Sequence, residues 1–281
     1  MSFEMSRRVA GTMAGIALAC LVAWCWARCD SALAARQPQA STHKPAKTKT
    51  AAAKVATAKE VAAPFRVGEK LNYRVSWSSF ATAATAELSI PERRDLYGWQ
   101  TWHFRGSAHT VSPVRSLFAI DDQFDSYTDA ATLESRQYET YLNEMGRRQN
   151  QQWRFVTEGE ASRASGAAVV VLAGTRDPLG MLYSLRCVDW QHTPEIRVPV
   201  YDGHKMYEVR ARLETAAEAV EVPAGKFSAA RVGIHLFQHK AEVSGINFAM
   251  WVASDGARTP VLMRAELPFG SLRVELASAL R

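Results

Sequence analysis

From Phe65 to the C-terminus, apolar and polar residues alternate with a period of two, and this pattern limits the fold more than any other feature of the sequence. Tyr73, Val75 and Trp77, for example, alternate with the polar residues Arg74 and Ser76. A period of two is that of a β-strand with one buried face. The pattern therefore predicts a mainly β domain over residues 65–281.

Short turn signals separate many of these strand segments, namely Tyr97-Gly98, Asp202-Gly203, Ala224-Gly225 and Asp255-Gly256. Such pairs join neighbouring strands into antiparallel hairpins. We therefore expect about a dozen strands in one broad antiparallel sheet. A sheet of that width curls, so we predict a barrel or half-barrel around a core or a cavity.

Two segments break the strand pattern and predict short helices, near residues 113–118 and 178–188. Ser112-Pro113 and Asp177-Pro178 each place a side-chain acceptor at the N-cap and a proline at the first helical position. In the second segment apolar residues recur at every third position, at Leu179, Leu182, Leu185 and Val188. This face can pack on the sheet or plug one end of a barrel.

Residues 1–34 predict export from the cytoplasm. Arg7 and Arg8 precede the uncharged apolar run of residues 9–27, and Ala32-Leu33-Ala34 supplies the small residues that a signal peptidase recognises. The same run is nearly long enough to cross a bilayer, so an uncleaved inner-membrane anchor is the alternative. In both cases we expect the domain in the periplasm, either released or tethered.

Residues 35–64 predict a disordered linker, because they are rich in Ala, Lys and Pro and contain almost no large apolar side chain. The formal charge of +6 comes from this linker and the first 34 residues, since basic and acidic residues balance over 65–281. A domain with balanced, interspersed charges lacks the field that grips phosphate backbones. We therefore expect no nucleic-acid partner.

Motifs for nucleophilic or phosphate chemistry are absent or weak. Cys187 has His192 nearby in sequence, but its neighbourhood is apolar and favours a small buried hydrophobe over a nucleophile. Gly225-Lys226 follows no phosphate-binding loop, and no G-x-S-x-G, S-x-x-K or G-x-G-x-x-G segment occurs. We therefore predict no catalytic residue and no cofactor, and favour a protein that is not an enzyme over one that is.

Two groups of residues have spacings reminiscent of metal sites. His235 and His239 form H-x-x-x-H, but their flanks favour a strand, which would hold the two rings about 13 Å apart. The acidic cluster of Asp121, Asp122, Asp125 and Asp129 lacks the glycine and the glutamate of a calcium loop. We interpret this cluster as a solvated strand face and predict no metal site.

Aromatic residues are spread over the whole domain, at Tyr73, Trp77, Trp99, Trp102, Trp153, Tyr183, Trp190, Tyr201, Tyr207 and Trp251. We expect most of them in the core. The alternative is that some line an apolar cavity with Arg or Lys at its mouth, which would suit an anionic lipid headgroup.

Several segments follow one another along the chain in a characteristic order and spacing. They are GEKLNYRVSW, DDQFDSYTD, TLESRQYE, RDPLGMLYSLR, VPVYDGHKMYEV, VPAGKFSAARV and WVASDGARTPVLMRAELPFGSLRVEL. Together they resemble the DUF3108 family of exported bacterial proteins, whose function is uncharacterised. The resemblance covers most of residues 65–281 and implies an antiparallel β architecture outside the cytoplasm. It transfers no catalytic residue, and at Gly180, where relatives often have serine, it supports no site.

Three functional hypotheses follow. The leading one is non-enzymatic binding of an apolar or amphipathic envelope component, such as a lipid, or of a partner protein along the curved sheet. The second is a hydrolase of cell-wall or lipid material that uses carboxylates brought together by the fold, such as Asp121 or Asp125 with a facing histidine. The third is a membrane-tethered scaffold positioned by the linker.

Overall fold

The computed structural model describes residues 61–78, 80–162, 166–268 and 270–281. The predicted signal or anchor, and nearly all of the predicted linker, lie outside these described residues. Fourteen strands form one sheet, with the bounds β1 (Lys70–Trp77), β2 (Phe80–Leu96), β3 (Trp99–Thr110), β4 (Asp121–Asp129), β5 (Ser135–Glu144), β6 (Arg147–Val156), β7 (Val169–Val170), β8 (Glu195–Tyr201), β9 (Met206–Val222), β10 (Gly225–Gln238), β11 (Ala241–Glu242), β12 (Asn247–Ala253), β13 (Pro260–Leu267) and β14 (Gly270–Leu280). The described helices are α2 (Val114–Leu117), α3 (Glu158–Ala161) and α4 (Pro178–Cys187).

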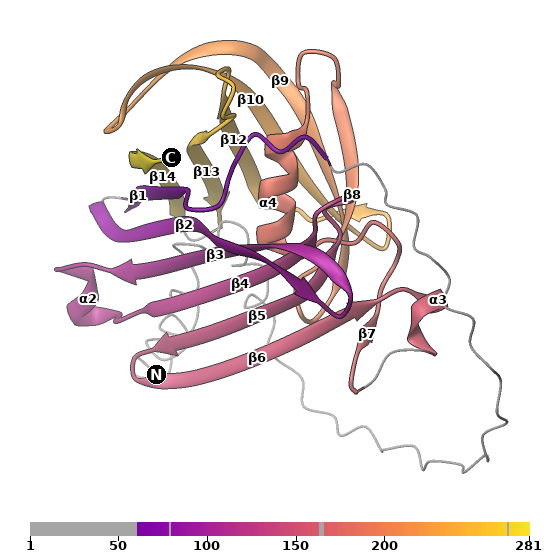
Figure 1. Cartoon of the computed structure of the whole chain (residues 1–281). Coiled ribbons are helices and arrows are strands. Elements are labelled where there is room, and N and C mark those ends of the chain that lie inside the picture. Colours follow the sequence, from indigo (N-terminus) through magenta and orange to yellow (C-terminus); the bar gives the residue numbers. More distant parts are fainter. Residues whose placement is uncertain (1–60, 79, 163–165, 269) are drawn as a thin grey trace, which may run out of the picture.

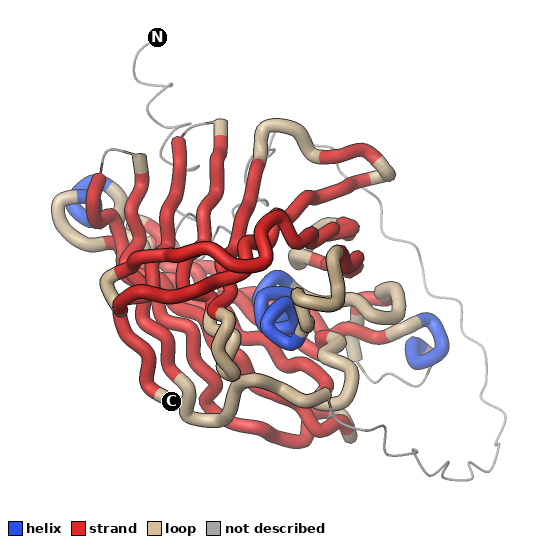
Figure 2. Tube along the Cα trace, turned by 90° about the horizontal axis from the view of Figure 1, so that it is seen from above, coloured by secondary structure: helices blue, strands red, loops and turns tan. Residues whose placement is uncertain are grey.

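The predicted mainly β fold is confirmed. The strand order is β7-β6-β5-β4-β3-β2-β1-β14-β13-β12-β10-β9-β8, with β11 beside β10. All of these pairs are antiparallel except β6 with β7. Alternation works as expected in β1, where Leu71, Tyr73 and Val75 are buried and Arg74 is exposed. The sheet curls around α4, which Figures 1 and 2 show with strands on several sides.

The curled sheet does not close into a continuous barrel, because β8 and the β6–β7 edge are its two ends. One extended segment joins the start of β5 to the β8 edge: Thr175 O accepts from Ser135 N at 3.0 Å, and Arg176 N donates to Pro199 O at 2.9 Å. Tyr201 N donates in turn to Arg176 O at 2.9 Å. Pro199 lacks an N–H group, which suits this edge strand because it cannot continue the ladder outward.

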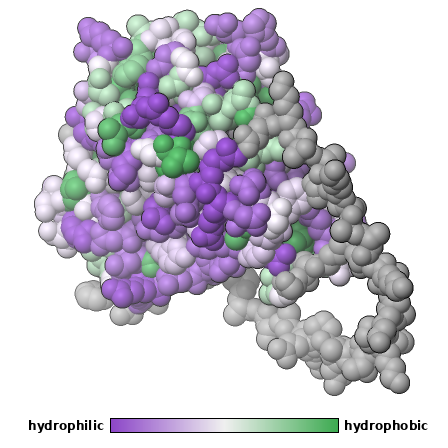
Figure 3. Space-filling model, in the orientation of Figure 1, coloured by the Kyte–Doolittle hydropathy of each residue, from purple (hydrophilic) through white to green (hydrophobic). Residues whose placement is uncertain are grey.

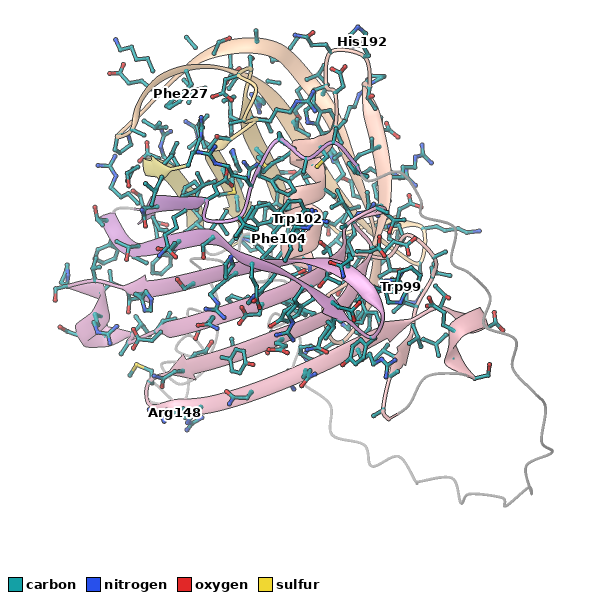
Figure 4. All side chains as sticks on the ribbon, in the orientation of Figure 1. Trp99, Trp102, Phe104, Arg148, His192 and Phe227 are labelled. Atoms are coloured by element: carbon teal, nitrogen blue, oxygen red, sulfur yellow. The ribbon has the colours of Figure 1, made fainter. Side chains whose placement is uncertain are left out.

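Helix α4 fills the interior of the curl. On one side, the rings of Tyr183 and Phe104 stack with centroids 3.8 Å apart, and Phe65 meets Tyr183 edge to face at 5.3 Å. On its other side, Met181 and Leu185 belong to a second apolar cluster, with Trp190, Val198, Val200, Val209, Ala211, Ala230, Val232, Ile234, Met250 and Val252. Figure 4 shows Trp102 and Phe104 beside this helix. The helix therefore serves as a central plug for the sheet.

The two predicted helix starts had different outcomes. Asp177 caps α4 as expected, because its Oδ1 accepts from Leu179 N at 2.9 Å and from Gly180 N at 2.8 Å, with Pro178 in the first turn. The cap predicted at Ser112 was wrong. Helix α2 begins one residue later than expected, its N-cap is Pro113, and no side chain caps it. The Thr110 hydroxyl instead fastens this loop by donating to Phe118 O at 2.8 Å.

Two long hairpins fold over the outside of the sheet, the face opposite α4. At the β2–β3 turn, Tyr97 OH donates to Gln137 Oε1 of β5 at 2.5 Å, and Arg154 of β6 covers the Tyr97 ring. At the β9–β10 turn, Ala224 N donates to Leu276 O of β14 at 3.0 Å. The Figure 1 view shows β9 and β10 arching across the top of the molecule.

Candidate functional site

The outer face of β3 to β6 is a ladder of polar side chains. Register places Arg105 opposite Asp125, Ser107 opposite Gln123 and His109 opposite Asp121. A cleft with a volume of about 420 Å³ lies on this face. We call it the polar cleft, and its lining residues are Arg105, Ser107, His109, Asp121, Asp122, Gln123, Tyr141, Leu142, Asn143, Arg148 and Asn150. Figure 3 shows that hydrophilic side chains predominate on the visible surface, with hydrophobic ones in small separate groups.

Asp125 lies beneath this ladder and is only 1% exposed. Its Oδ1 is 2.6 Å from His103 Nε2 and 2.7 Å from Arg105 Nε, and its Oδ2 accepts from Gln123 Nε2 at 2.6 Å. Burial alone would raise the pKa of Asp125, but hydrogen bonds from these three side chains outweigh it and bring the pKa below the usual value. Asp125 is therefore an ionised and fully bonded carboxylate.

Asp121 is held in a similar way at the rim. Arg115 donates to its two oxygens at 2.9 and 2.8 Å, and His109 Nδ1 lies 3.0 Å from Oδ1. The Arg115 hydrogen bonds are the main reason that the pKa of Asp121 falls to about 2. Asp121 and Asp125 thus each contact a facing histidine, as the hydrolase hypothesis requires. Each carboxylate is also hydrogen-bonded to an arginine.

Asp122 is the exception among the acidic residues of the cleft. It is buried, accepts a hydrogen bond from Asn143 N at 2.9 Å, and has no ion pair with any described cation. Burial raises the pKa of Asp122 to about 7, and the nearby charges of Glu144 and Asp121 add to this effect. A carboxyl group that is about half protonated and the ionised Asp121 therefore adjoin the same cleft near pH 7.

The interpretation of the acidic cluster as a solvated strand face was wrong. Asp122, Asp125 and Asp129 are all buried. Asp129 accepts from Ala131 N at 2.8 Å and Thr132 N at 2.9 Å, which fastens the β4–β5 turn. His103 and Arg105 of the neighbouring strand β3 contact Asp125, and alternation within β4 does not predict such contacts.

The predicted strand placement of the two histidines holds only for His235. It lies in β10 with Nδ1 2.8 Å from Glu242 Oε1, whereas His239 lies in the turn after that strand. In the ranges 61–78, 80–162, 166–268 and 270–281, no group of three or more His, Cys, Asp or Glu side chains could hold a metal ion. Gly225-Lys226 opens β10 at the hairpin turn.

Cys187 and His192 are not brought together as a catalytic pair. Cys187 is half-buried at the end of α4, and burial raises the pKa of its thiol to about 11. His192 Nδ1 lies 2.8 Å from Asp189 Oδ2 in the exposed loop that follows, which Figure 4 shows at the edge of the molecule. A thiol with a raised pKa is a poor nucleophile.

Most of the aromatic residues singled out from the sequence lie in the core; six are buried, namely Tyr73, Trp102, Tyr183, Trp190, Tyr207 and Trp251. An apolar cavity between Leu182, Phe248 and Met263 has a volume of only about 20 Å³. That is room for about one water molecule. A shallow groove of about 700 Å³ runs between Val61–Pro64 and the loop after α4.

Of the residues that line the polar cleft, the sequence interpretation singled out only Asp121 and Asp122, and those it missed include Tyr141, Arg148 and Asn150. The available signal was the run RRQNQQ in β6, which is polar at successive positions and so has no apolar face. Such a strand must expose polar side chains on both faces of the sheet edge. The register between β6 and its neighbour β5 determines which of these side chains lie in the cleft.

The comparison with known families decides the relationship of the chain. The model of a protein family of unknown function, DUF3108, matches residues 72–277. The chain belongs to the DUF3108 family. The predicted resemblance is therefore confirmed.

This DUF3108 protein was also compared with solved structures. A β-barrel-like protein of the domain of unknown function DUF1849 from Brucella abortus has 13% identity and a TM-score of 0.50, covering 76% of this chain and 97% of its own. A candidate exported protein with a YmcC-like fold from Bacteroides fragilis has 8% identity and a TM-score of 0.33, with coverages of 79% and 100%. A candidate lipoprotein from Parabacteroides distasonis has 11% identity and a TM-score of 0.37, with coverages of 79% and 99%.

At 13% identity, the likeness to the DUF1849 protein concerns the fold alone. No curated protein sequence matches this DUF3108 chain. In the part of the chain that the structure describes, no helix combines the length and apolar character needed to cross a membrane.

Proposed function

We propose that this DUF3108 protein is a non-enzymatic binding protein of the cell envelope, and that it binds the polar part of an amphipathic or polar envelope component in the polar cleft. One observation carries the proposal. Asp121 and Asp125 are already bonded to arginine and histidine, while Arg148 and Asn150 on the rim are exposed. Carboxylates whose charges are already compensated by hydrogen-bonded cations are better suited to ligand binding than to proton transfer.

A guest enclosed by the curled sheet has less support than one bound outside it. Tyr183, Phe104 and Phe65 fill the space around α4, and the apolar cavity beside this helix has a volume of about 20 Å³. The polar cleft, at about 420 Å³, is within the range of about 300–1,000 Å³ typical of small-molecule sites. The proposal therefore places the ligand on the outer face.

Binding can be tested on the full chain with two separately prepared fractions of a bacterial envelope, its polysaccharides and its extracted lipids. We expect one fraction to be retained on the protein during ultrafiltration, and the double variant Tyr141→Ala/Asn150→Ala to retain at least tenfold less. Asn247→Ala, an exposed asparagine on β12, is the matched control. Equal retention by wild type and the double variant would contradict the proposal.

Hydrolysis is the second candidate function, and the state of Asp122 favours it. A partly protonated Asp122 and an ionised Asp121 supply an acid and a carboxylate at one cleft, as glycoside hydrolysis requires. Incubation with purified peptidoglycan or envelope polysaccharide distinguishes the two functions. Binding alone releases no reducing ends, whereas a hydrolase would release them in wild type and lose this activity in Asp122→Asn.

We also propose that the protein is exported to the periplasm, either released or held at the inner membrane by residues 9–27. The support is the pattern of residues 1–34, which lies outside the described part of the chain. Fractionation of cells that express the full chain tests this. Release with the periplasmic contents at a reduced mass indicates cleavage, and recovery with the inner membrane at full mass indicates an anchor. Recovery in the cytoplasm would contradict export.

A further inference from the structure

Among the residues that the structure describes, Arg148 is a cation without a partner, in a cleft whose other cations pair with carboxylates. Its exposed side chain makes no ion pair or hydrogen bond with any described residue, whereas Arg105 is bonded to Asp125 and Arg115 to Asp121. Figure 4 shows Arg148 near the β5–β6 turn, well away from Trp102 and Phe104 beside α4. A free guanidinium in such a position fits a carboxylate or phosphate group of a ligand, because its planar fork can bind two oxygens at once.

The side chains that adjoin Arg148 suit hydroxyl groups. Register places Asn143 opposite Arg148 and Tyr141 opposite Asn150 on the same face of the sheet. The amide side chains of Asn143 and Asn150 have no hydrogen-bond partner among the described residues, and each amide both donates and accepts. Hydroxyl groups of a sugar also donate and accept, so the two sets are complementary.

Tyr141 adds an apolar platform to these polar groups. Its hydroxyl donates to Glu139 Oε2 at 2.5 Å, which fixes the side chain on the sheet, and the residue is 39% exposed. An exposed ring that is held in place offers a flat apolar face at little entropic cost. The faces of sugar rings, which carry C–H groups, pack on such surfaces.

We infer that the polar cleft binds a sugar that carries an acidic group, with its ring on Tyr141, its hydroxyls bonded to Asn143 and Asn150, and its carboxylate or phosphate paired with Arg148. This inference rests on the proposed function and names the class of its ligand. The sugar can come from a free acidic oligosaccharide or from the headgroup of a glycolipid, since both present the same chemistry to the cleft.

Titration calorimetry of the full chain with defined sugars tests the inference. The probes are trigalacturonate as an acidic sugar, maltotriose as a neutral one, and phosphatidylcholine vesicles with and without lipopolysaccharide. We expect trigalacturonate or the lipopolysaccharide vesicles to bind at least tenfold more tightly than maltotriose or plain vesicles, and binding to weaken as salt increases. Preference for trigalacturonate indicates a free glycan, and preference for the lipopolysaccharide vesicles indicates a glycolipid.

Neighbouring arginines provide the matched variants. Arg148→Gln should weaken binding of the acidic probe about tenfold or more, because it removes a charge-assisted pair. Arg147→Gln, one position earlier and on the opposite face of β6, should bind as wild type does. Circular dichroism melting curves establish that both variants are folded, since both positions are exposed.

Equal binding of trigalacturonate and maltotriose, or unchanged binding by Arg148→Gln, would overturn the inference. So would the absence of binding to every sugar probe. If the envelope fraction is nevertheless retained by wild type and lost by Tyr141→Ala/Asn150→Ala, only the ligand class is wrong. If that retention also fails, the proposed function fails with it.

Discussion

Arg186 and Glu69 form a bidentate ion pair inside the curled sheet, with Nη1 to Oε1 at 2.6 Å and Nη2 to Oε2 at 3.0 Å. Their side chains are 0% and 2% exposed. Arg186 also donates to the backbone carbonyls of Ala257 at 3.1 Å and Arg258 at 3.2 Å. One guanidinium therefore joins the start of β1, the end of α4 and the loop before β13.

Two of these three points of attachment, in MLYSLR and SDGART, lie within the residues 72–277 that match the DUF3108 family, whereas Glu69 in GEKL lies just before them. Asp177 in a fourth segment, RDPLG, accepts hydrogen bonds from Ser126 Oγ and Ser135 Oγ, both at 2.5 Å. The contacts of these residues show that they hold α4 in the sheet. These contacts are structural.

Removing one partner of this ion pair should destabilise the protein strongly. We expect Glu69→Leu or Arg186→Met to cost about 3–5 kcal/mol of unfolding free energy, because each leaves a buried charge without compensation. The double variant should lose less than the sum of the single losses, since it leaves no buried charge. Urea unfolding followed by tryptophan fluorescence measures all three, and additive losses would show that the two side chains do not depend on each other.

Gly180 should not tolerate a side chain, although it lies in a helix. A Cβ there would lie 2.8 Å from Thr128 Cγ2 and 3.0 Å from Ser135 Oγ, both in the buried interface between α4 and the sheet. We expect Gly180→Ala to cost about 1–3 kcal/mol through overpacking, despite the better helix propensity of alanine. Thermal unfolding is the measurement.

Two variants control this prediction. Gly159→Ala in α3 meets nothing within 4 Å and should be neutral or slightly stabilising. Thr128→Ser removes the Cγ2 methyl, so Gly180→Ala/Thr128→Ser should recover part of the loss. If Gly180→Ala unfolds no earlier than wild type, the close packing of α4 on β4 is wrong.

Asp122 should make the protein less stable as pH rises from about 4 to about 7. Its pKa is raised from 3.8 to about 7 in the folded state, so over this range the unfolded chain ionises while the folded chain keeps the proton. The folded state therefore loses stability until about pH 7, and the penalty is then constant. Asp122→Asn removes it.

The melting temperatures of wild type and Asp122→Asn at several pH values measure this effect. We expect the advantage of the variant to be small at pH 4 and to grow up to about pH 7. Asp121→Asn is the opposite control, because the pKa of Asp121 is lowered to about 2 and its contribution stabilises the folded state above pH 4. A constant difference between Asp122→Asn and wild type across pH 4 to 8 would contradict the prediction.

Cys187 should react slowly with alkylating reagents. A rise in its pKa from 9.0 to about 11 reduces the thiolate fraction near pH 8 roughly a hundredfold. Iodoacetamide labelling, with the peptide that contains Cys187 quantified by mass spectrometry, should therefore be about a hundredfold slower in the native protein than in urea. Equal rates in both conditions would indicate an exposed, ordinary thiol.

Local patterns in the sequence were sufficient for the fold class. The alternation of Leu71, Tyr73 and Val75 with polar residues predicts a strand because side chains in a strand point to opposite faces, whatever lies beside it. Asp177-Pro178 predicts the start of α4 for the same kind of reason, since a cap acts within three residues. The resemblance to the DUF3108 family also implied an antiparallel arrangement of these strands.

Which residues form the polar cleft, and which distant residues pair in the core, is determined only by the tertiary structure. Arg186 meets Glu69 across 117 positions, and the polar cleft takes side chains from β3, β4, β5 and β6. Asp125, which the sequence pattern placed in solvent, is buried and bonded to His103 and Arg105 of the neighbouring strand β3. Strand alternation states which face a residue occupies, but the register and the curl of the sheet determine what covers that face. Those two quantities arise from the packing of the whole chain around α4, so no local segment contains them.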